Sequence, residues 1–153
     1  MQVPRLYTKQ YPDPYHDQTF VVRTSIAHGR EDRPVSITVP DTWSQIAVDI
    51  LGNKYMRKTG VPQSDGTDGR ETDARHVFRR LANCWAYWGL REKYFASEED
   101  AQAYADEMQY MLSHQIGAPN SPQWFNTGLH LAYALEGEAQ GWLRTAALRV
   151  SPF

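Results

Sequence analysis

The fold is decided by the stretch ETDARHVFRRLANCWAYW, which spans residues 71–88. Its apolar side chains recur three or four positions apart, at Ala74, Val77, Leu81, Cys84 and Trp88. A spacing of this kind places the side chains on one face of an α-helix. We therefore expect an amphipathic helix from Glu71 to about Trp88, ended by Gly89 because glycine commonly closes a helix.

A second helix is predicted on the C-terminal side of this stretch. Ser97 is a good N-terminal cap, and the acidic residues 98–100 that follow it suit the positive end of a helix dipole. The helical spacing continues through Ala101, Tyr104, Met108, Met111 and Gln115. Gly117 should end this helix, and a further short helix should follow Pro122 and reach about Leu135.

The N-terminal part of the chain is predicted to be less helical. Residues 1–18 are rich in Pro, Tyr and Asp and should form an extended arm that packs through its tyrosines. The β-branched runs at 20–22 and 35–39 flank a polar loop that contains glycine. Two such runs around a loop of this kind predict a β-hairpin.

A helix should open after the hairpin, with Asp41 or Thr42 as its cap. The apolar face predicted for it consists of Ile46, Ala47, Ile50, Leu51 and Tyr55. Residues 60–70 are polar and glycine-rich and predict a loop. The whole pattern predicts a mainly α-helical domain with a small β-hairpin.

The length, composition and net charge of the chain exclude several classes of function. With 153 residues, 41% hydrophobic and 22% charged, the chain is sized and composed like one globular domain. A net charge of −2 gives no basic field for nucleic acid. No stretch approaches the roughly 20 apolar residues of a membrane span, and residues 1–10 lack the apolar segment of a signal peptide. The one cysteine, Cys84, rules out an internal disulfide and fits a reducing cytoplasm.

The segment richest in functional signals is APNSPQWFNTG, residues 118–128. Proline favours the first position of a helix, so Ser121 before Pro122 is predicted to be an N-terminal cap. The free backbone N–H groups at that end would form an anion site. Asn120 and Gln123 add amide groups that suit a phosphate or a ribose. The alternative is a capped helix that needs no ligand and whose aromatic side chains fill the core.

Four segments, in order along the chain, resemble one known family. They are residues 43–51 with Lys54 and Tyr55, residues 71–75 with Val77, Phe78, Leu81 and Ala82, residues 108–115, and the signature PNSPQWFNTGLH at 119–130. This set resembles the adenosylcobalamin-dependent (class II) ribonucleotide reductases. The resemblance runs from about Tyr7 to Gly141, so residues 19–141 are identified as the N-terminal domain of this family.

The resemblance implies a fold and a chemistry. It implies a helical N-terminal region that leads into an α/β barrel, in an enzyme that reduces ribonucleotides to 2′-deoxyribonucleotides. In this family adenosylcobalamin supplies the initiating radical, a cysteine thiyl takes the ribose 3′-hydrogen, and a cysteine pair supplies the electrons. The family's Ser-Pro element helps to hold the substrate, which implies a substrate-binding role for Ser121, and for Asn120, Pro122 and Gln123 beside it.

The resemblance ends at residue 141. Residues 142–153 form a divergent tail, and in the family the barrel, the catalytic cysteines and most of the cobalamin site would follow this region. We therefore expect no catalytic residue in this chain, and no activity without a barrel-containing remainder or companion subunit. The alternative function is a non-catalytic remnant that binds nucleotide or a reductase subunit.

Other chemistry-bearing residues favour structural roles. Cys84 lies on the apolar face of its helix and should be a packing residue with a raised pKa. The five histidines show no close pair at ligand spacing, so no metal site is expected, and His130 should be a hydrogen-bonded structural residue. An aromatic cluster consists of Trp85, Tyr87, Trp88, Tyr94 and Phe95. We expect it to fill the core rather than to stack on single-stranded nucleic acid.

Overall fold

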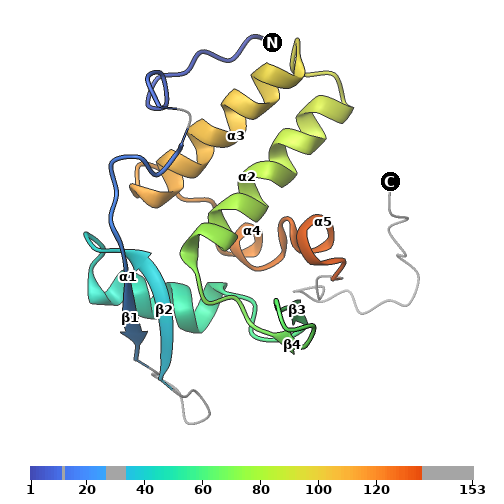
Figure 1. The fold of residues 1–153 in the computed structure, drawn as a ribbon. Helices are drawn as coiled ribbons and strands as arrows, with labels where there is room; N and C mark the ends of the chain where they lie inside the picture. The colour runs from blue at the N-terminus through green and yellow to red at the C-terminus, as the bar shows by residue number, and fades with distance from the viewer. Residues whose placement is uncertain (12, 27–33, 136–153) are drawn as a thin grey trace.

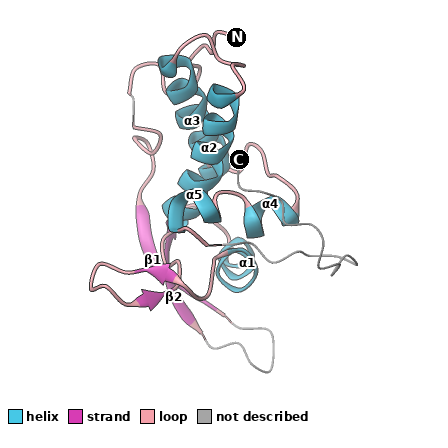
Figure 2. Cartoon of the chain, turned by 90° about the vertical axis from the view of Figure 1, so that its right-hand side faces the viewer, coloured by secondary structure: helices cyan, strands magenta, loops and turns pink. Residues whose placement is uncertain are grey.

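Two long helices dominate the molecule, which a computed structural model describes at residues 1–11, 13–26 and 34–135. The helices are α2 (Ala74–Arg91) and α3 (Glu98–Ser113), and they lie side by side in both views (Figures 1 and 2). The mainly α-helical prediction is confirmed for this part of the chain.

A β-hairpin lies at the opposite end of the molecule from the tips of α2 and α3 (Figure 1). Strand β1 (Phe20–Ser25) pairs antiparallel with β2 (Val35–Pro40), as predicted, with Val22 opposite Thr38. Ile37 and Val39 of β2 are fully buried and form one edge of the core. The Thr38 amide donates to the Thr72 carbonyl at 2.7 Å, which joins the hairpin to the segment before α2.

The ends of α2 differ from the prediction. The Asp73 carboxylate accepts from the Arg75 amide, so the helix begins at Ala74 rather than at Glu71. It also continues past Gly89, because this glycine serves packing and not termination. A Cβ at Gly89 would lie 2.3 Å from the Phe95 ring, so only glycine allows this ring to pack against the helix.

The buried face of α2 is largely the predicted one. Ala74, Val77, Leu81 and Cys84 are all buried, but Trp88 is 44% exposed. Trp88 is exposed because the segment after the helix places Phe95, and not Trp88, against Gly89. In α3 the cap is confirmed, since the Asp100 amide donates to Ser97 Oγ at 3.1 Å.

The helix after the hairpin, α1 (Gln45–Ile50), has a different cap and a different buried face from those expected. Residues 41–43 first form a turn, so Ser44 and not Asp41 or Thr42 caps the helix, accepting from the Ala47 amide at 3.2 Å. Ile46 is 71% exposed, whereas Val48 is fully buried. Apolar residues lie on both sides of this short helix, and spacing alone does not determine which side meets the core.

Two features follow α1 that the sequence did not predict. The helix passes directly into a π-helical turn, η1 (Leu51–Tyr55). The expected loop at 60–70 contains a second, very short hairpin, in which β3 (Val61–Pro62) pairs antiparallel with β4 (Asp68–Gly69).

The single helix predicted after Pro122 is wrong, because the chain forms two short helices. They are α4 (Ser121–Asn126) and α5 (Leu129–Tyr133), and Gly128 lies between them. Gly128 has φ +80°, and a Cβ there would lie 2.0 Å from the Arg80 carbonyl oxygen. The helical path therefore breaks where the backbone approaches α2.

The N-terminal arm, residues 1–11 and 13–18, forms no helix or strand, bends at residues 6–10, turns at residues 14–17 and packs on α3. Tyr7 stacks on Tyr110 of α3 with ring centroids 4.8 Å apart. The Glu107 carboxylate accepts from the Tyr7 and Thr8 amides and from Thr8 Oγ1. Figure 1 shows the arm passing along α3. No described helix has both the length and the apolar character that a membrane crossing requires.

The core lies where the hairpin, α1, α2 and α4 meet. Its buried residues include Ile37, Val39, Trp43, Val48, Leu51, Phe78, Leu81 and Trp124. The predicted tail at 142–153 and the domain boundary at 141 lie outside the described residues.

Candidate functional site

The four predicted site residues, Asn120 to Gln123, lie at the beginning of α4. Ser121 is half-buried, and its hydroxyl oxygen is 3.2 Å from the Tyr55 hydroxyl. Gln123 Oε1 accepts from Thr127 Oγ1 at 2.5 Å, so this amide braces the far end of the same helix. Asn120 and Pro122 are exposed. The segment thus presents one hydroxyl pair and one free amide toward solvent.

The capping role predicted for Ser121 is wrong. Asn120 occupies the cap position with extended backbone, makes no capping bond through its side chain, and leaves Ser121 as the first helical residue. The helix has only six residues, so its dipole is small. The anion site expected from a capped helix end therefore loses its main physical support. The substrate-binding role of Ser121 stays a prediction that depends on its hydroxyl and on its neighbour Tyr55.

Tyr55 lies beside Ser121, a position that neither its predicted helix face nor its family-like segment indicates. Its ring stacks on Trp124 at 5.5 Å with an interplanar angle of 15°, and it meets Phe125 at 5.4 Å. The π-helical turn places it there, because a wider turn directs its last side chain differently from an α-helix. Such turns often accompany functional sites. Tyr55 and Ser121 together form the polar edge of an aromatic stack.

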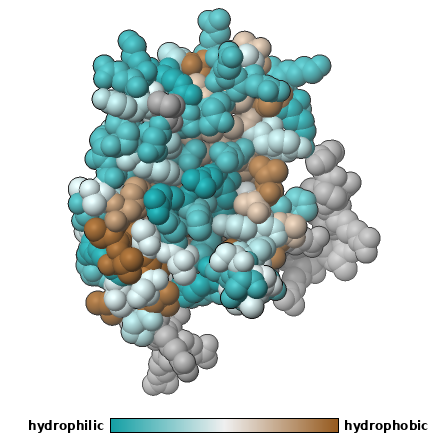
Figure 3. Space-filling view, viewed as in Figure 1, coloured by the Kyte–Doolittle hydropathy of each residue, from teal (hydrophilic) through white to brown (hydrophobic). Residues whose placement is uncertain are grey.

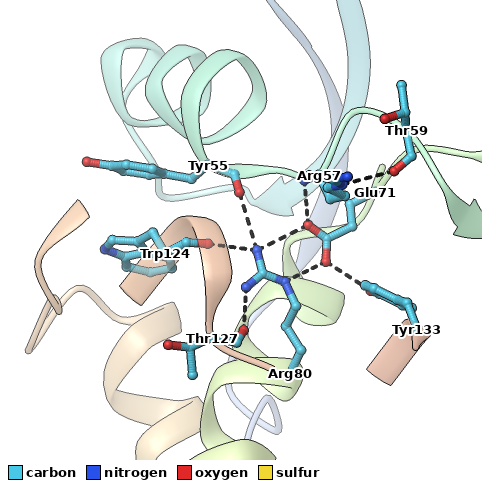
Figure 4. Close-up of polar contacts among 8 residues, drawn as sticks. All are labelled: Tyr55, Arg57, Thr59, Glu71, Arg80, Trp124, Thr127 and Tyr133. Carbon is cyan, nitrogen blue, oxygen red and sulfur yellow. Dashed lines mark hydrogen bonds and ion pairs between the residues drawn. The ribbon is translucent and has the colours of Figure 1, made fainter. Parts of the chain in front are cut away.

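Beneath this stack lies a buried ion pair between Arg80 of α2 and Glu71. The Arg80 Nε donates to Glu71 Oε1 at 2.8 Å, and both side chains are almost wholly inaccessible to solvent. The remaining guanidinium nitrogens donate to the carbonyls of Trp124 and Thr127, each at 2.8 Å, and of Tyr55 at 3.3 Å (Figure 4). One arginine therefore joins the π-helical turn and the C-terminal half of α4 to α2.

The Glu71 carboxylate also has several hydrogen-bond donors. It accepts from Arg80, from the Arg57 amide at 2.8 Å and from the Tyr133 hydroxyl at 2.9 Å (Figure 4). Burial and the adjacent Glu71 charge raise the pKa of the Tyr133 hydroxyl, which therefore stays protonated and donates. We call this network, Glu71 with Arg80 and their partners, the buried latch.

The buried latch is not among the features predicted from the sequence, although the sequence contains one signal for it. Arg80 lies three residues after Val77 and four before Cys84, so it falls on the apolar face of its helix. An arginine on a buried face requires a buried acid, because an unpaired charge is costly there. Glu71 precedes the helix, and neither its place at the predicted helix start nor its family-like segment indicates that it is the partner of Arg80.

The other candidate residues have mixed outcomes. Cys84 is buried as predicted, and burial raises the pKa of its thiol. Phe95 is buried, but Tyr87, Trp88 and Tyr94 are 44%, 44% and 67% exposed, so the expectation that the whole aromatic cluster fills the core is wrong. These three lie near the connection between α2 and α3, where no described element covers them. Among the described residues, no three His, Cys, Asp or Glu side chains are placed to hold a metal ion.

Comparison with known proteins agrees with the resemblance. A family model described as class II vitamin B12-dependent ribonucleotide reductase matches residues 33–115, which run from the hairpin through α3. A vitamin B12-dependent ribonucleotide reductase of Agrobacterium fabrum is 42% identical to the chain over 92% of its length. One from Bradyrhizobium diazoefficiens is 39% identical over the same share, and one from Rhodopirellula baltica is 38% identical over 68%.

These matches show the class of protein: the chain corresponds to an N-terminal region of a large reductase. The chain spans about 14% of the length of the first two relatives. It belongs to the class II vitamin B12-dependent ribonucleotide reductase family.

Proposed function

We propose that this chain is the N-terminal, substrate-holding and structural region of a cytoplasmic ribonucleotide reductase. In this role it works with a barrel-containing remainder, or a companion subunit, that converts ribonucleotides to 2′-deoxyribonucleotides by thiyl-radical chemistry. The observation that supports it is the buried latch, which fixes α4 through the carbonyls of Trp124 and Thr127. A fixed α4 holds Ser121 and Asn120 ready for a ligand, and pre-ordering of this kind reduces the entropy lost on binding.

Within this proposal, the side chains have separate roles. Ser121 Oγ donates to a phosphate or ribose oxygen of the nucleotide, and Asn120 offers its exposed amide beside it. Pro122 and Gln123 contribute through the backbone, because the Gln123 side chain is engaged with Thr127. Tyr55 keeps the Ser121 hydroxyl oriented.

Adenosylcobalamin is the cofactor of the proposed whole enzyme and supplies the radical that starts the reaction. In a corrinoid the ring itself provides most of the cobalt ligands, so the protein mainly needs a broad surface for the ring. Ser121 lines neither of the two cavities considered below, and we propose that the remainder of the enzyme forms most of the corrinoid site.

A nucleotide titration of the chain tests the substrate-holding role. Amide NMR signals of residues 120–127 should shift saturably with added ADP or CDP, and Ser121→Ala should weaken binding about tenfold, the effect of one lost hydrogen bond to a charged group. Ser36→Ala is the control, because Ser36 is a solvent-exposed serine on β2, away from α4. Equal affinities for the two variants, or shifts confined to other segments, would refute the role of Ser121.

A non-catalytic nucleotide- or subunit-binding module is expected to give the same titration result. That second candidate rests on the same surface, the Ser121 and Tyr55 hydroxyl groups at the beginning of α4. Activity in the presence of a reductase remainder distinguishes the two.

A further inference from the structure

A cavity lies between α2, the β3–β4 hairpin and α5, away from the proposed substrate surface on α4. It has a volume of about 530 Å³, and its lining includes Arg70, His76, Arg79, Asn83, Leu131 and Tyr133. None of Asn120, Ser121, Pro122 and Gln123 lines it. We call it the α2–α5 cavity.

The charge of this cavity is one-sided. Three arginines and a histidine line it, and no aspartate or glutamate is among the described lining residues. The charge of Arg80 is compensated by Glu71 in the buried latch. Arg79 differs, because within the described part of the chain its guanidinium forms no hydrogen bond or ion pair with an acid or a carbonyl, and the residue is exposed. A cavity wall with an uncompensated guanidinium favours an anion.

The rest of the lining limits what the anion can be. Leu131 is 48% exposed, and together with Val61, Pro62 and Ala132 it makes part of the wall apolar. The Tyr133 ring is held in place, because its hydroxyl donates to Glu71. An apolar wall beside arginine suits a ligand with a flat or apolar body and one charged group.

A neighbouring cavity serves as a comparison. It has about 570 Å³ and shares His76 and Arg79, but its lining also contains Asp13, Asp73 and Arg75. Arg75 is paired with Asp73 through two hydrogen bonds of 3.1 and 2.5 Å to the same carboxylate oxygen. These acids offset the positive charge, so an anion favours the α2–α5 side of Arg79. Figure 3 shows hydrophilic residues covering the middle of the face that Figure 1 presents.

We propose that the α2–α5 cavity binds a small phosphate monoester with a planar or apolar body, with its phosphate at Arg79 and its body against Leu131 and Tyr133. Arginine suits the phosphate because its planar group offers paired donors to two oxygens. This site is separate from the proposed substrate surface on α4, so either one can fail without the other.

The test uses 1-naphthyl phosphate, with neutral 1-naphthol as the comparison ligand, on the whole chain labelled with ¹⁵N. The phosphate should bind at least tenfold more tightly than the naphthol, and it should shift the amides of Asn83 and residues 131–133. Arg79→Ala should weaken binding about tenfold or more, as expected for a lost charge-assisted hydrogen bond. An unchanged amide spectrum of the variant without ligand shows that it is folded.

Two control variants make the result decisive. Arg75→Ala removes an arginine that lines only the neighbouring cavity, and Ser121→Ala alters only the α4 surface, so both should bind within about twofold of the parent chain. Equal binding of the phosphate and the naphthol would overturn the proposal. So would a loss in Arg75→Ala with shifts near Tyr15, or a loss in Ser121→Ala with shifts at 120–123, each of which places the ligand elsewhere.

Discussion

The guanidinium of Arg80 connects segments that are far apart in the chain. It meets Glu71, nine positions earlier, and the Thr127 carbonyl, 47 positions later. Each ion of a buried pair gains little from water, so the pair depends on complete hydrogen bonding. Here Nη1 and Nη2 of Arg80 donate to the carbonyls of Thr127, Trp124 and Tyr55, which explains how a full charge is accommodated beneath an aromatic stack.

Removing Arg80 should therefore be strongly destabilising. We expect Arg80→Met to lower the free energy of unfolding by about 3–5 kcal/mol, because it leaves the Glu71 charge buried without a counter-ion and removes the Arg80 donor from the carbonyls of Trp124 and Thr127. Urea denaturation measures this loss. Arg79→Met, next to it but exposed, is the matched control and should change stability by less than about 0.5 kcal/mol. Equal effects of the two substitutions would mean that the latch does not stabilise the fold.

Gly128 provides a second residue-scale prediction with an internal control. Gly66 has nearly the same φ, +82° against +80°, but a Cβ at Gly66 would meet nothing within 4 Å. Gly66→Ala should thus cost only the backbone strain, about 1–2 kcal/mol. Gly128→Ala should cost about 4 kcal/mol or more, because its Cβ would also collide with the Arg80 carbonyl. Thermal unfolding of both variants tests this, and similar losses would show that close approach to α2 is unimportant.

At the scale of elements, the N-terminal arm is attached to α3 mainly by acids. Burial raises the pKa of Glu107, but hydrogen bonds from Thr8 and Tyr7 outweigh burial and hold the pKa below its ordinary value of 4.5. A depressed folded-state pKa means that this contribution is complete above about pH 4.5 and is lost as the pH falls through the lower value. The arm should therefore detach in acid before the helices unfold.

Amide signals of Tyr7 and Thr8 report this detachment in a titration from about pH 6 to about pH 3. Glu107→Gln should show a weakened arm already at neutral pH and a smaller change in acid. Some pH dependence should remain in that variant, because Asp100 also holds the arm through the Val3 amide and has a lowered pKa. Arm signals that stay constant to the acid limit would contradict this assignment.

The elements that could be predicted from sequence are those whose signals are local. Ser97 before three acids specifies a helix start, and β-branched runs around a glycine-containing loop specify a hairpin. The failures have non-local causes. Ile46 is exposed because the core lies on the other side of a short helix, and the break at Gly128 follows from contact with the Arg80 carbonyl. No window of sequence around either residue contains that information.

At the scale of the whole molecule, one group of elements forms the structural support, and another carries the proposed substrate surface. The hairpin, α1 and α2 form the core, the arm lies on α3, and the latch attaches α4 to this support (Figure 1). The candidate site could be predicted in part, since the residues of α4 were identified but their supports were not. Tyr55, Glu71 and Arg80 come from separate segments, and only folding brings them together.

The last prediction concerns catalysis. Ribonucleotide reduction of the proposed type needs a cysteine pair, and this chain has one cysteine, Cys84, which is buried with a raised thiol pKa. The chain alone, given adenosylcobalamin, a dithiol and a ribonucleotide, should therefore form no deoxyribonucleotide, as measured by chromatography of the products. A second protein is then added: the Agrobacterium fabrum relative from which the segment that aligns with this chain has been removed. The mixture should show activity that neither part has alone.

The Arg80→Met variant makes this experiment specific to the latch. If α4 must be held in place for the substrate, this variant should restore little activity even below its unfolding temperature, whereas Arg91→Met, at the C-terminal end of the same helix, should restore as much as the parent chain. Turnover by the isolated chain would contradict the need for a second cysteine. Stable association with the shortened relative but no product would instead favour a non-catalytic, subunit-binding module, because contact would then form without a working substrate site.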